Sequence, residues 1–127
     1  MPLVRIDTLD GYTPEERAAL GDGVHRALLE AIGIPPLDRF QVITSHAPGS
    51  LVFDPEYLGI HRTPRVVFVQ IAMSAGRTLE QKRALYGAIA RNLAARPGVR
   101  QEDVFVNLVE VAKENWSFGN GVAQYAQ

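Results

Sequence analysis

The feature of this 127-residue sequence that most constrains its fold is an internal repeat with an offset of 65 residues. Thr13 corresponds to Thr78 in this register, and Gly33 corresponds to Gly98. The other matching pairs are Glu15 with Glu80, Leu20 with Leu85, Asp38 with Asp103, and Phe40 with Phe105. Two unrelated helical units can share such punctuation, but six matches in one register at cap, core and turn positions favour duplication.

Each copy of the repeat carries the signals of one helix. The segment Thr13-Pro14-Glu15-Glu16 places Thr at the N-cap, Pro at the first helical position and Glu at N3. Apolar residues then recur at helical spacing until Gly33. The segment Thr78-Leu79-Glu80-Gln81 is a second capping box, and Pro97-Gly98 ends its helix. The sequence therefore predicts two helices, each followed by a turn.

Strands are predicted on both sides of each helix. The four segments are short, rich in Val, Ile, Leu or Phe, and bounded by turn residues; they span 3–8, 39–44, 66–73 and 104–111. Residues 66–73 contain one polar residue, Gln70, so we expect a strand buried on both faces. Residues 46–64 are expected to form a long connection with one helical turn, and the aromatic tail to form a turn or small hairpin.

These elements predict an α/β fold made of duplicated β-α-β units. Each unit should have parallel strands, and the two units should form a four-stranded sheet with both helices on one face. We expect a single domain over 1–127, with repeat halves at about 2–45 and 66–111 and an aromatic C-terminal tail at 112–127. Both alternating sets of strand residues are apolar, so the uncovered face predicts a homo-oligomer.

Composition excludes several classes of function. The chain has 13 Lys and Arg against 14 Asp and Glu, which argues against an electrostatic nucleic-acid binder. It has no Cys, so thiol chemistry and Cys-ligated metals are excluded. Its three His residues lack metal-ligand spacing, and no cofactor or metal is expected. No apolar run approaches a membrane span and the start lacks signal-peptide character, so a cytoplasmic protein is expected.

Two residues are candidates for chemistry at strand ends. Pro2 follows Met1, and methionine removal would make it a secondary amine at the start of a strand. A cationic neighbour and burial would favour the neutral amine, which can act as an acid, base or nucleophile. Arg77 lies at the carboxyl end of a strand beside a helix N-terminus, where anions bind readily. The alternatives are an ordinary chain terminus and a solvated arginine.

Other candidates have equally plain structural explanations. Asp38 is adjacent to Arg39, and the equivalent position of Asp103 in the repeat favours a turn role for both carboxylates. Trp116 and Phe118 are two residues apart in the tail, where they would either fill the core or form the wall of an apolar pocket.

Four segments together resemble the tautomerase superfamily, and most closely its malonate semialdehyde decarboxylase-like branch. They are Met1-Pro2-Leu3, residues 38–44 (DRFQVIT), residues 77–82 (RTLEQK) and residues 115–124 (NWSFGNGVAQ). The resemblance extends from Pro2 to about Tyr125, and the Trp-Ser-Phe-Gly segment is its most specific part. It implies a homotrimer or hexamer of β-α-β repeats that uses the amino-terminal proline as catalytic group.

The resemblance also implies roles for individual residues. Pro2 would be the acid or base, Asp38 would position water or assist proton transfer, and Arg77 would bind the substrate carboxylate and stabilise the enolate. Trp116, Phe118 and Tyr125 would form the aromatic pocket wall, and Arg39 is a lower-ranked second cation. The decarboxylase has two arginines separated by one residue after the third strand. Here that loop reads Ser74-Ala75-Gly76-Arg77, with one arginine.

The expected function is a keto–enol tautomerase acting on small 2-oxo or enol carboxylates without cofactor or metal. One alternative is a decarboxylase or hydratase of 3-oxo acids like malonate semialdehyde. It ranks second because the loss of one arginine weakens carboxylate binding and argues against decarboxylation. The other is a trimeric binding protein on the same scaffold, whose Pro2 is not catalytic. The expected partners are a small carboxylate and two further copies of the chain, with no nucleic acid and no membrane.

Overall fold

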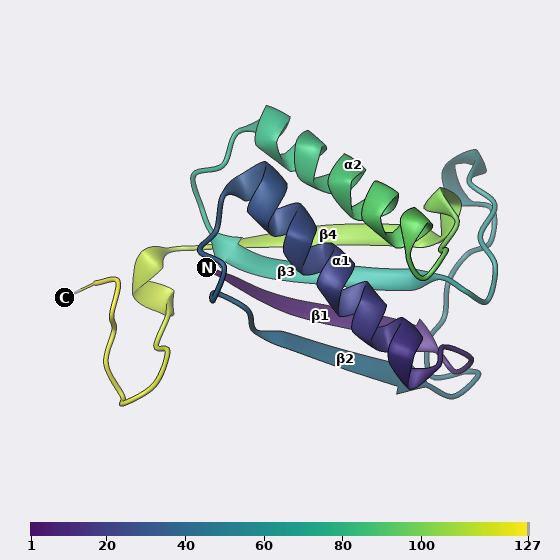
Figure 1. The fold of residues 1–127 in the computed structure, drawn as a ribbon, viewed down its shortest axis with the longest axis horizontal. Helices are drawn as coiled ribbons and strands as arrows, with labels where there is room; N and C mark the ends of the chain where they lie inside the picture. The colour runs from purple at the N-terminus through teal and green to yellow at the C-terminus, as the bar shows by residue number, and fades with distance from the viewer. Residues whose placement is uncertain (127) are drawn as a thin grey trace.

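The computed structural model describes residues 1–126, so Gln127, the last residue of the expected tail, lies outside the described residues. Residues 1–126 form four strands and two long helices, which are labelled in Figure 1. In chain order they are β1 (Pro2–Leu9), α1 (Pro14–Ile32), β2 (Gln41–His46), β3 (Val67–Ser74), α2 (Leu79–Ala95) and β4 (Val104–Val111). Short 3₁₀ turns span Tyr57–Gly59, Gln101–Asp103 and Lys113–Asn115. The predicted β-α-β duplication is confirmed.

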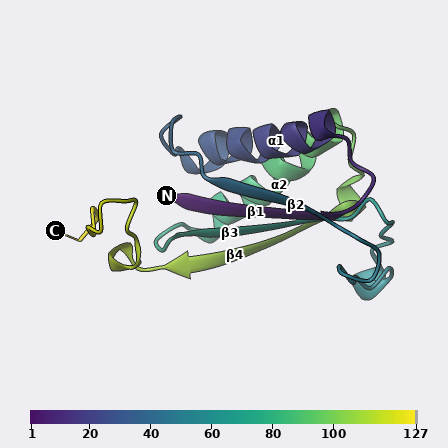
Figure 2. The same cartoon turned by 90° about the horizontal axis from the view of Figure 1, so that it is seen from below.

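The sheet joins the two units in the order β2-β1-β3-β4. Strand β1 is parallel to β2, and β3 is parallel to β4, as each β-α-β unit requires. The central pair, β1 and β3, is antiparallel. Figure 2 shows α1 and α2 covering the same face of this sheet, which confirms the predicted layering.

The helix caps identified in the sequence are formed. The Thr13 side chain accepts from the Glu16 N–H, and the Glu16 carboxylate accepts from the Thr13 N–H. Thr78 and Gln81 make the same pair of hydrogen bonds at the start of α2. Helix α1 ends at Gly33, whose φ of 72° lies in the left-handed region. The two copies of the repeat thus begin their helices by one local mechanism.

The core lies between the helices and the inner face of the sheet. Alternate residues of β1 and β3 point into it, and the apolar faces of both helices close it. Its fully buried side chains include Val4, Ile6, Leu20, Val24, Leu28, Val67, Val69, Ile71, Leu85, Ile89 and Leu93. Burying one such side chain stabilises a fold by about 1.5–3 kcal/mol, so this layer holds the strand ends in place.

The prediction that the third strand is buried on both faces is wrong for the single chain. Residues of β3 alternate, with Ile71 and Val69 buried against the helices and Gln70 exposed on the opposite face. Beside Gln70 on this outer face lie exposed apolar residues of neighbouring strands, including Leu3, Val42, Phe105 and Val109. The apolar residues of β3 thus lie on both faces of the sheet. The single chain covers the inner face and leaves the outer face open.

The second predicted strand is displaced by two residues. We expected 39–44, whereas β2 spans Gln41–His46. The Asp38 N–H donates to Pro35 O and the Arg39 N–H donates to Leu37 O, so Asp38 and Arg39 belong to the turn before the strand. The long connection does contain one helical turn, at Tyr57–Gly59.

Candidate active site

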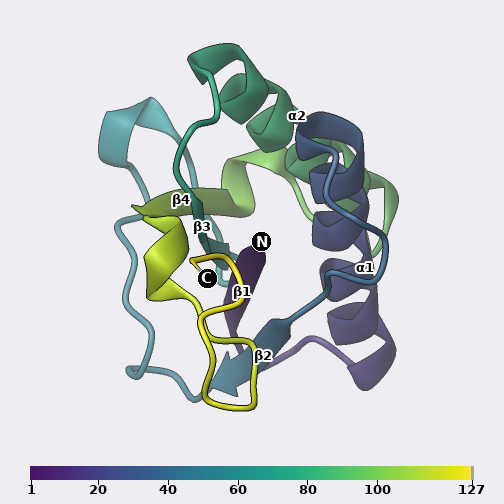
Figure 3. The ribbon, with the colours of Figure 1, turned by 90° about the vertical axis from the view of Figure 1, so that its left-hand side faces the viewer.

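Strand register brings the ends of all four strands to one edge of the sheet. Pro2 of β1 is paired with Met73 near the end of β3, and Ser74 is paired with Val111 at the end of β4. Since Val4 is paired with Gln41, the residues before β2 run beside the first residues of β1. Figure 3 looks onto this edge, across which the C-terminal tail folds.

A cavity of about 280 Å³ lies at this edge, lined by Met1, Ser74, Arg77, Lys113 and Tyr125. Arg77 follows β3 and Lys113 follows β4, and the Ala75 N–H donates to Val111 O (2.9 Å), joining the two segments. The fold therefore gathers the amino end of the chain, two cations, a hydroxyl and an aromatic side chain around one small space.

The amino end of the chain faces a buried carboxylate. Pro2 is buried at the start of β1, and the amino nitrogen of Met1 lies 3.7 Å from an Asp38 carboxylate oxygen. This distance is too long for a hydrogen bond and defines an ion pair. The candidate residue Asp38 thus lies beside the chain start that carries Pro2, although 36 positions separate the two residues in the sequence.

Asp38 is buried without a hydrogen-bond partner. Its residue is 6% exposed, and neither carboxylate oxygen accepts a hydrogen bond from residues 1–126. Burial raises the pKa of Asp38 above its ordinary value, and the chain's amino group and His25 oppose this shift only in part. Asp38 is thus not an exposed carboxylate, although it belongs to the turn before β2.

The equivalent carboxylate in the repeat behaves differently. Asp103 is fully buried and accepts from both the backbone N–H and the hydroxyl of Thr63, each at 2.7 Å. A buried carboxylate satisfied in this way anchors a loop. Duplicated positions have therefore diverged: Asp103 serves the fold, whereas the Asp38 oxygens accept no hydrogen bond from residues 1–126 and lie beside the chain terminus.

The tail forms an aromatic wall next to the cavity. Trp116 stacks on Phe118 with ring centroids 5.4 Å apart, and Phe118 contacts Tyr125 edge-on at 5.0 Å. The Trp116 indole N–H donates to the Ser74 hydroxyl (3.1 Å), fastening this wall to the end of β3. Gln124 closes the loop by accepting from the Phe118 N–H and donating to Gly119 O. The tail is a turn, as expected, but has no hairpin strands within residues 112–126.

Arg39 is not brought to this cavity. Its guanidinium forms an ion pair with Asp22 at 2.7 Å and lines a separate cavity together with His25 and Arg96. The reason is the turn before β2, which buries Asp38 and leaves Arg39 exposed beside α1. Asp38 and Arg39 are adjacent in the sequence but thus face different parts of the molecule.

Sequence reasoning missed two residues of the cavity, Ser74 and Lys113. Each follows from the ends of the predicted strands, because parallel strands that end in register place the residues after them side by side. Lys113 comes two residues after the end of β4, and Arg77 comes three after the end of β3. That spacing was a signal for a second cation.

Two other kinds of feature are absent from the part of the chain that the structure describes. Residues 1–126 contain no group of three or more His, Asp or Glu side chains that could hold a metal ion. None of the described helices has the length and apolar character needed to cross a membrane.

Comparison with known proteins identifies relatives of the whole chain. Two sequence models described as "Tautomerase enzyme" match residues 38–119 and 2–60. Probable tautomerase YusQ of Bacillus subtilis (strain 168) is 39% identical over 124 residues, covering 98% of each chain. Probable tautomerase YrdN of the same organism is 32% identical, over 98% of this chain and 96% of its own.

Solved structures share the fold at similar coverage. FG41 malonate semialdehyde decarboxylase inhibited by 3-bromopropiolate is 43% identical, with a TM-score of 0.91 over 97% of this chain and 93% of its own. A second malonate semialdehyde decarboxylase, described as having decarboxylase and hydratase activities, is 34% identical with a TM-score of 0.91, over 97% and 95%. A fused 4-OT symmetric trimer is 26% identical with a TM-score of 0.80, over 98% of each chain. By sequence and by fold, this chain belongs to the tautomerase family of enzymes.

Proposed function

We propose that this tautomerase interconverts the keto and enol forms of small 2-oxo carboxylates, with Pro2 as the proton carrier after removal of Met1. The observation that carries the proposal is the buried Asp38 carboxylate, which lacks a hydrogen-bond partner within residues 1–126 and lies 3.7 Å from the chain's amino nitrogen. A carboxylate in that place stabilises a protonated amine, so it suits a terminal amine that takes up and releases a proton.

Removal of Met1 prepares the site in two ways. Met1 is followed by proline, a small residue after which the initiator methionine is commonly removed, and this frees the secondary amine of Pro2. Met1 also lines the cavity with Arg77 and Lys113, so its loss opens space for a substrate beside the new amine. Neighbouring cations favour the neutral, basic form of that amine before it takes the proton.

The other cavity residues supply binding and orientation. Arg77 binds the substrate carboxylate through its planar fork of donors. Asp38 orients the proton or a water beside Pro2. The aromatic residues Trp116, Phe118 and Tyr125 form the apolar side of the pocket and exclude water from the reacting carbons. No step needs a cofactor.

We further propose that the chain acts as a single domain, residues 1–127, in a cytoplasmic homotrimer. The exposed apolar residues of the outer sheet face support association, since one chain leaves Leu3, Val42, Phe105 and Val109 open to solvent. The fused 4-OT relative is a symmetric trimer. Cyclic symmetry would cover the same face on every copy.

A second candidate reaction is decarboxylation or hydration of a 3-oxo acid like malonate semialdehyde. The likeness to two solved malonate semialdehyde decarboxylases favours it. The loop after β3 carries one arginine, Arg77, where the decarboxylase pattern has two, so we rank it second. Release of CO₂ and acetaldehyde from malonate semialdehyde, measured beside the ketonisation of an enol acid, separates the two reactions.

The test of the first reaction is Pro2→Ala assayed on phenylenolpyruvate. Alanine also permits methionine removal, so the variant keeps a terminal amine but loses the proline ring. We expect turnover to fall by about 10²-fold or more, in the range of a lost acid–base group. Pro48→Ala, in an exposed turn, is the matched control. Unchanged turnover of Pro2→Ala, or an intact chain mass that still includes Met1 in active enzyme, would favour the non-catalytic binding protein instead.

A further inference from the structure

The cavity at the edge of the sheet is lined by two cations and no carboxylate. Arg77 and Lys113 line it from different loops, with Met1, Ser74 and Tyr125 as the remaining lining residues. Neither cation forms an ion pair within residues 1–126. Two positive charges held at one small cavity are a binding arrangement for two negative oxygens.

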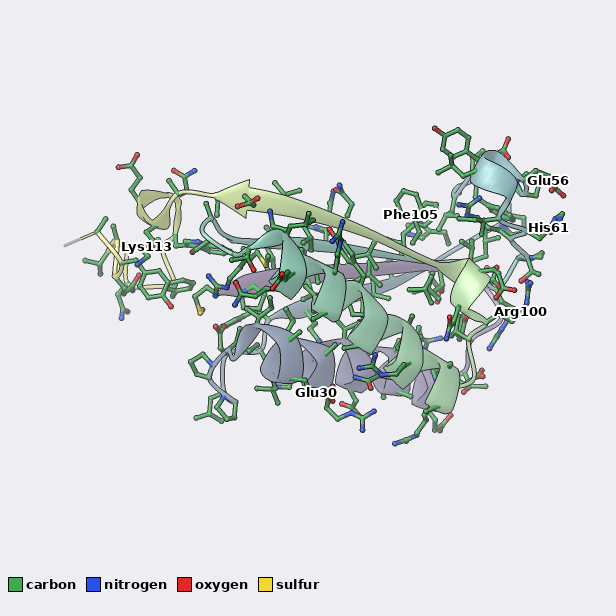
Figure 4. All side chains as sticks on the ribbon, turned by 90° about the horizontal axis from the view of Figure 1, so that it is seen from above. Glu30, Glu56, His61, Arg100, Phe105 and Lys113 are labelled. Carbon is green, nitrogen blue, oxygen red and sulfur yellow. The ribbon has the colours of Figure 1, made fainter. Side chains whose placement is uncertain are left out.

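Lys113 is positioned by the fold at the end of β4. The Asn115 N–H donates to Ala112 O (3.0 Å), and this hydrogen bond belongs to a 3₁₀ turn that starts at Lys113. Trp116, the next residue after this turn, is fastened to Ser74 by its indole N–H. Figure 4 shows Lys113 at the opposite end of the sheet from Phe105 and Arg100. Its backbone thus lies between β4 and Trp116, whose indole is hydrogen-bonded to Ser74.

Nearby carboxylates leave Lys113 available to a ligand. Glu110, on the preceding strand β4, forms an ion pair with Lys82, and that contact lowers the pKa of Glu110. Asp38 lies beside the chain's amino nitrogen. The charges at the site therefore divide into an amine with its carboxylate and a pair of cations without one.

Keto–enol transfer creates charges that fit this division. When a proton leaves C3 of a 2-oxo acid, the C–H electron pair forms the C2–C3 double bond and the carbonyl π electrons move to oxygen. The proton goes to the Pro2 nitrogen, so one cation and one enolate oxygen appear together. Asp38 balances the protonated amine and Arg77 balances the carboxylate. The enolate oxygen requires a further cation. Transfer of the proton from Pro2 to that oxygen completes the enol.

We propose that Lys113 is this cation and a catalytic residue: its ammonium binds the C2 oxygen of the substrate while Arg77 binds the adjacent carboxylate. This inference rests on the proposed function and defines its substrate class as acids with an oxygen at C2, next to the carboxylate. An acid that lacks this oxygen leaves one cation unpaired and is a poor ligand. Preorganised charge at a developing oxyanion is commonly the largest electrostatic contribution to such a reaction.

Kinetics of Lys113→Met and Lys113→Arg test the catalytic role. Removal of one preorganised oxyanion donor costs roughly 10²–10³-fold in kcat. Lys113 is exposed to screening solvent, so we expect a loss of about 10- to 100-fold, in kcat more than in KM. Lys113→Arg should recover most of the rate because it keeps the charge. Glu114→Gln, an adjacent exposed residue that does not line the cavity, is the matched control and should match wild type.

Ligand binding supplies a readout that does not depend on turnover. Oxalate carries two adjacent oxyanion groups and mimics the enolate of a 2-oxo acid, whereas propanoate carries the carboxylate alone. In Lys113→Met we expect the Kd of oxalate to rise about 10-fold or more, and that of propanoate to change less than about 2-fold. Arg77→Ala should weaken both ligands. NMR titration of enzyme shown by mass to lack Met1 measures each constant.

The outcomes separate the two proposals. If Pro2→Ala abolishes turnover but Lys113→Met equals wild type in kcat and in oxalate affinity, the role of Lys113 is overturned and the proposed function stands. If Lys113→Met loses affinity for oxalate but Pro2→Ala keeps full turnover, the proposed function fails. The role of Lys113 in binding a second anionic oxygen then still stands. Both proposals are supported if Pro2→Ala loses turnover and Lys113→Met loses kcat and oxalate affinity. Lys113→Arg should then recover most of the rate.

Discussion

The carboxylate of Asp38 lies 3.7 Å from the amino nitrogen of Met1 and has no hydrogen-bond partner within residues 1–126. A buried polar group without a partner typically costs about 1–3 kcal/mol, and more when it is charged. Asp103, at the equivalent position of the repeat, avoids this cost through two hydrogen bonds from Thr63. The fold can satisfy a carboxylate at this position, so the unsatisfied state of Asp38 points to a role at the chain's amino end.

Asp38→Asn should lower activity and raise stability at neutral pH. Burial raises the pKa of Asp38, so the native state binds its proton more tightly than the unfolded chain does. The stabilising contribution of Asp38 is therefore full below the ordinary Asp pKa of about 3.9 and is lost as pH rises through the raised value. In thermal unfolding, the Tm of Asp38→Asn minus the Tm of wild type should increase from acid pH to pH 7.

Asp103→Asn is the control for that experiment. It replaces one of the two carboxylate oxygens that accept from Thr63 with an NH₂ donor, so it should destabilise at pH 7 by about 1–3 kcal/mol. An Asp38→Asn variant that loses stability at pH 7 as Asp103→Asn does would mean that Asp38 is a structural anchor and would remove the basis for its role beside Pro2.

Arg77→Ala should weaken binding of carboxylate substrates. A hydrogen bond to a charged group contributes about 1.5–3 kcal/mol, which corresponds to a rise in KM of about 10- to 100-fold. Arg77→Lys keeps the charge but lacks the two-pronged geometry, so it should recover only part of the affinity. Steady-state kinetics at fixed pH measures both. A KM unchanged in Arg77→Ala would assign the carboxylate to another group.

The hydrogen bond between the Trp116 indole and the Ser74 hydroxyl should couple the aromatic wall to the cavity. Trp116→Phe keeps an aromatic ring over Phe118 but removes the indole N–H that donates to the Ser74 hydroxyl. We expect kcat/KM to fall by less than about 10-fold, equivalent to one neutral hydrogen bond. A double-mutant cycle with Ser74→Ala should be non-additive by at least about 0.5 kcal/mol. Strict additivity would show that the bond contributes nothing.

A charge on the outer sheet face should dissociate the oligomer. Phe105 is 48% exposed in the single chain and contacts Phe68 at 5.1 Å between ring centroids. Phe105→Asp should shift the particle from about three times the 14.0 kDa chain mass to one, measured by light scattering. Leu79→Asp is the control, because Leu79 is 60% exposed on the helix side. A wild-type particle of one chain would contradict the trimer.

The sequence predicted local structure well where the signal is local. Thr13 and Thr78 start helices through hydrogen bonds within four residues, so their motifs carry the whole cause. The burial of β3 was overestimated because apolar residues such as Phe68 indicate burial without indicating whether the same chain supplies the cover. Periodicity alone cannot separate a core from an interface.

The sequence indicated part of the candidate site. The differences at Arg39 and Lys113 have a physical cause. Pro2, Asp38 and Arg77 lie at ends of neighbouring strands, which strand order and the family resemblance both indicate. The structure separates Arg39 from these residues because one residue of turn decides whether a side chain faces α1 or the chain start. Lys113 was missed because its place depends on the register of β3 with β4.

The most direct test of the central claim is covalent labelling of the purified chain with 3-bromopropiolate, a compound that inhibits the related FG41 decarboxylase. Mass spectrometry of the intact chain and of its amino-terminal peptide locates the adduct. A chain extended before Met1, which cannot expose the Pro2 amine, is the control. We expect one adduct per chain, on Pro2 of a chain that lacks Met1, with matching loss of tautomerase activity. Inactivation with the adduct on another residue, or full activity in the extended chain, would contradict it.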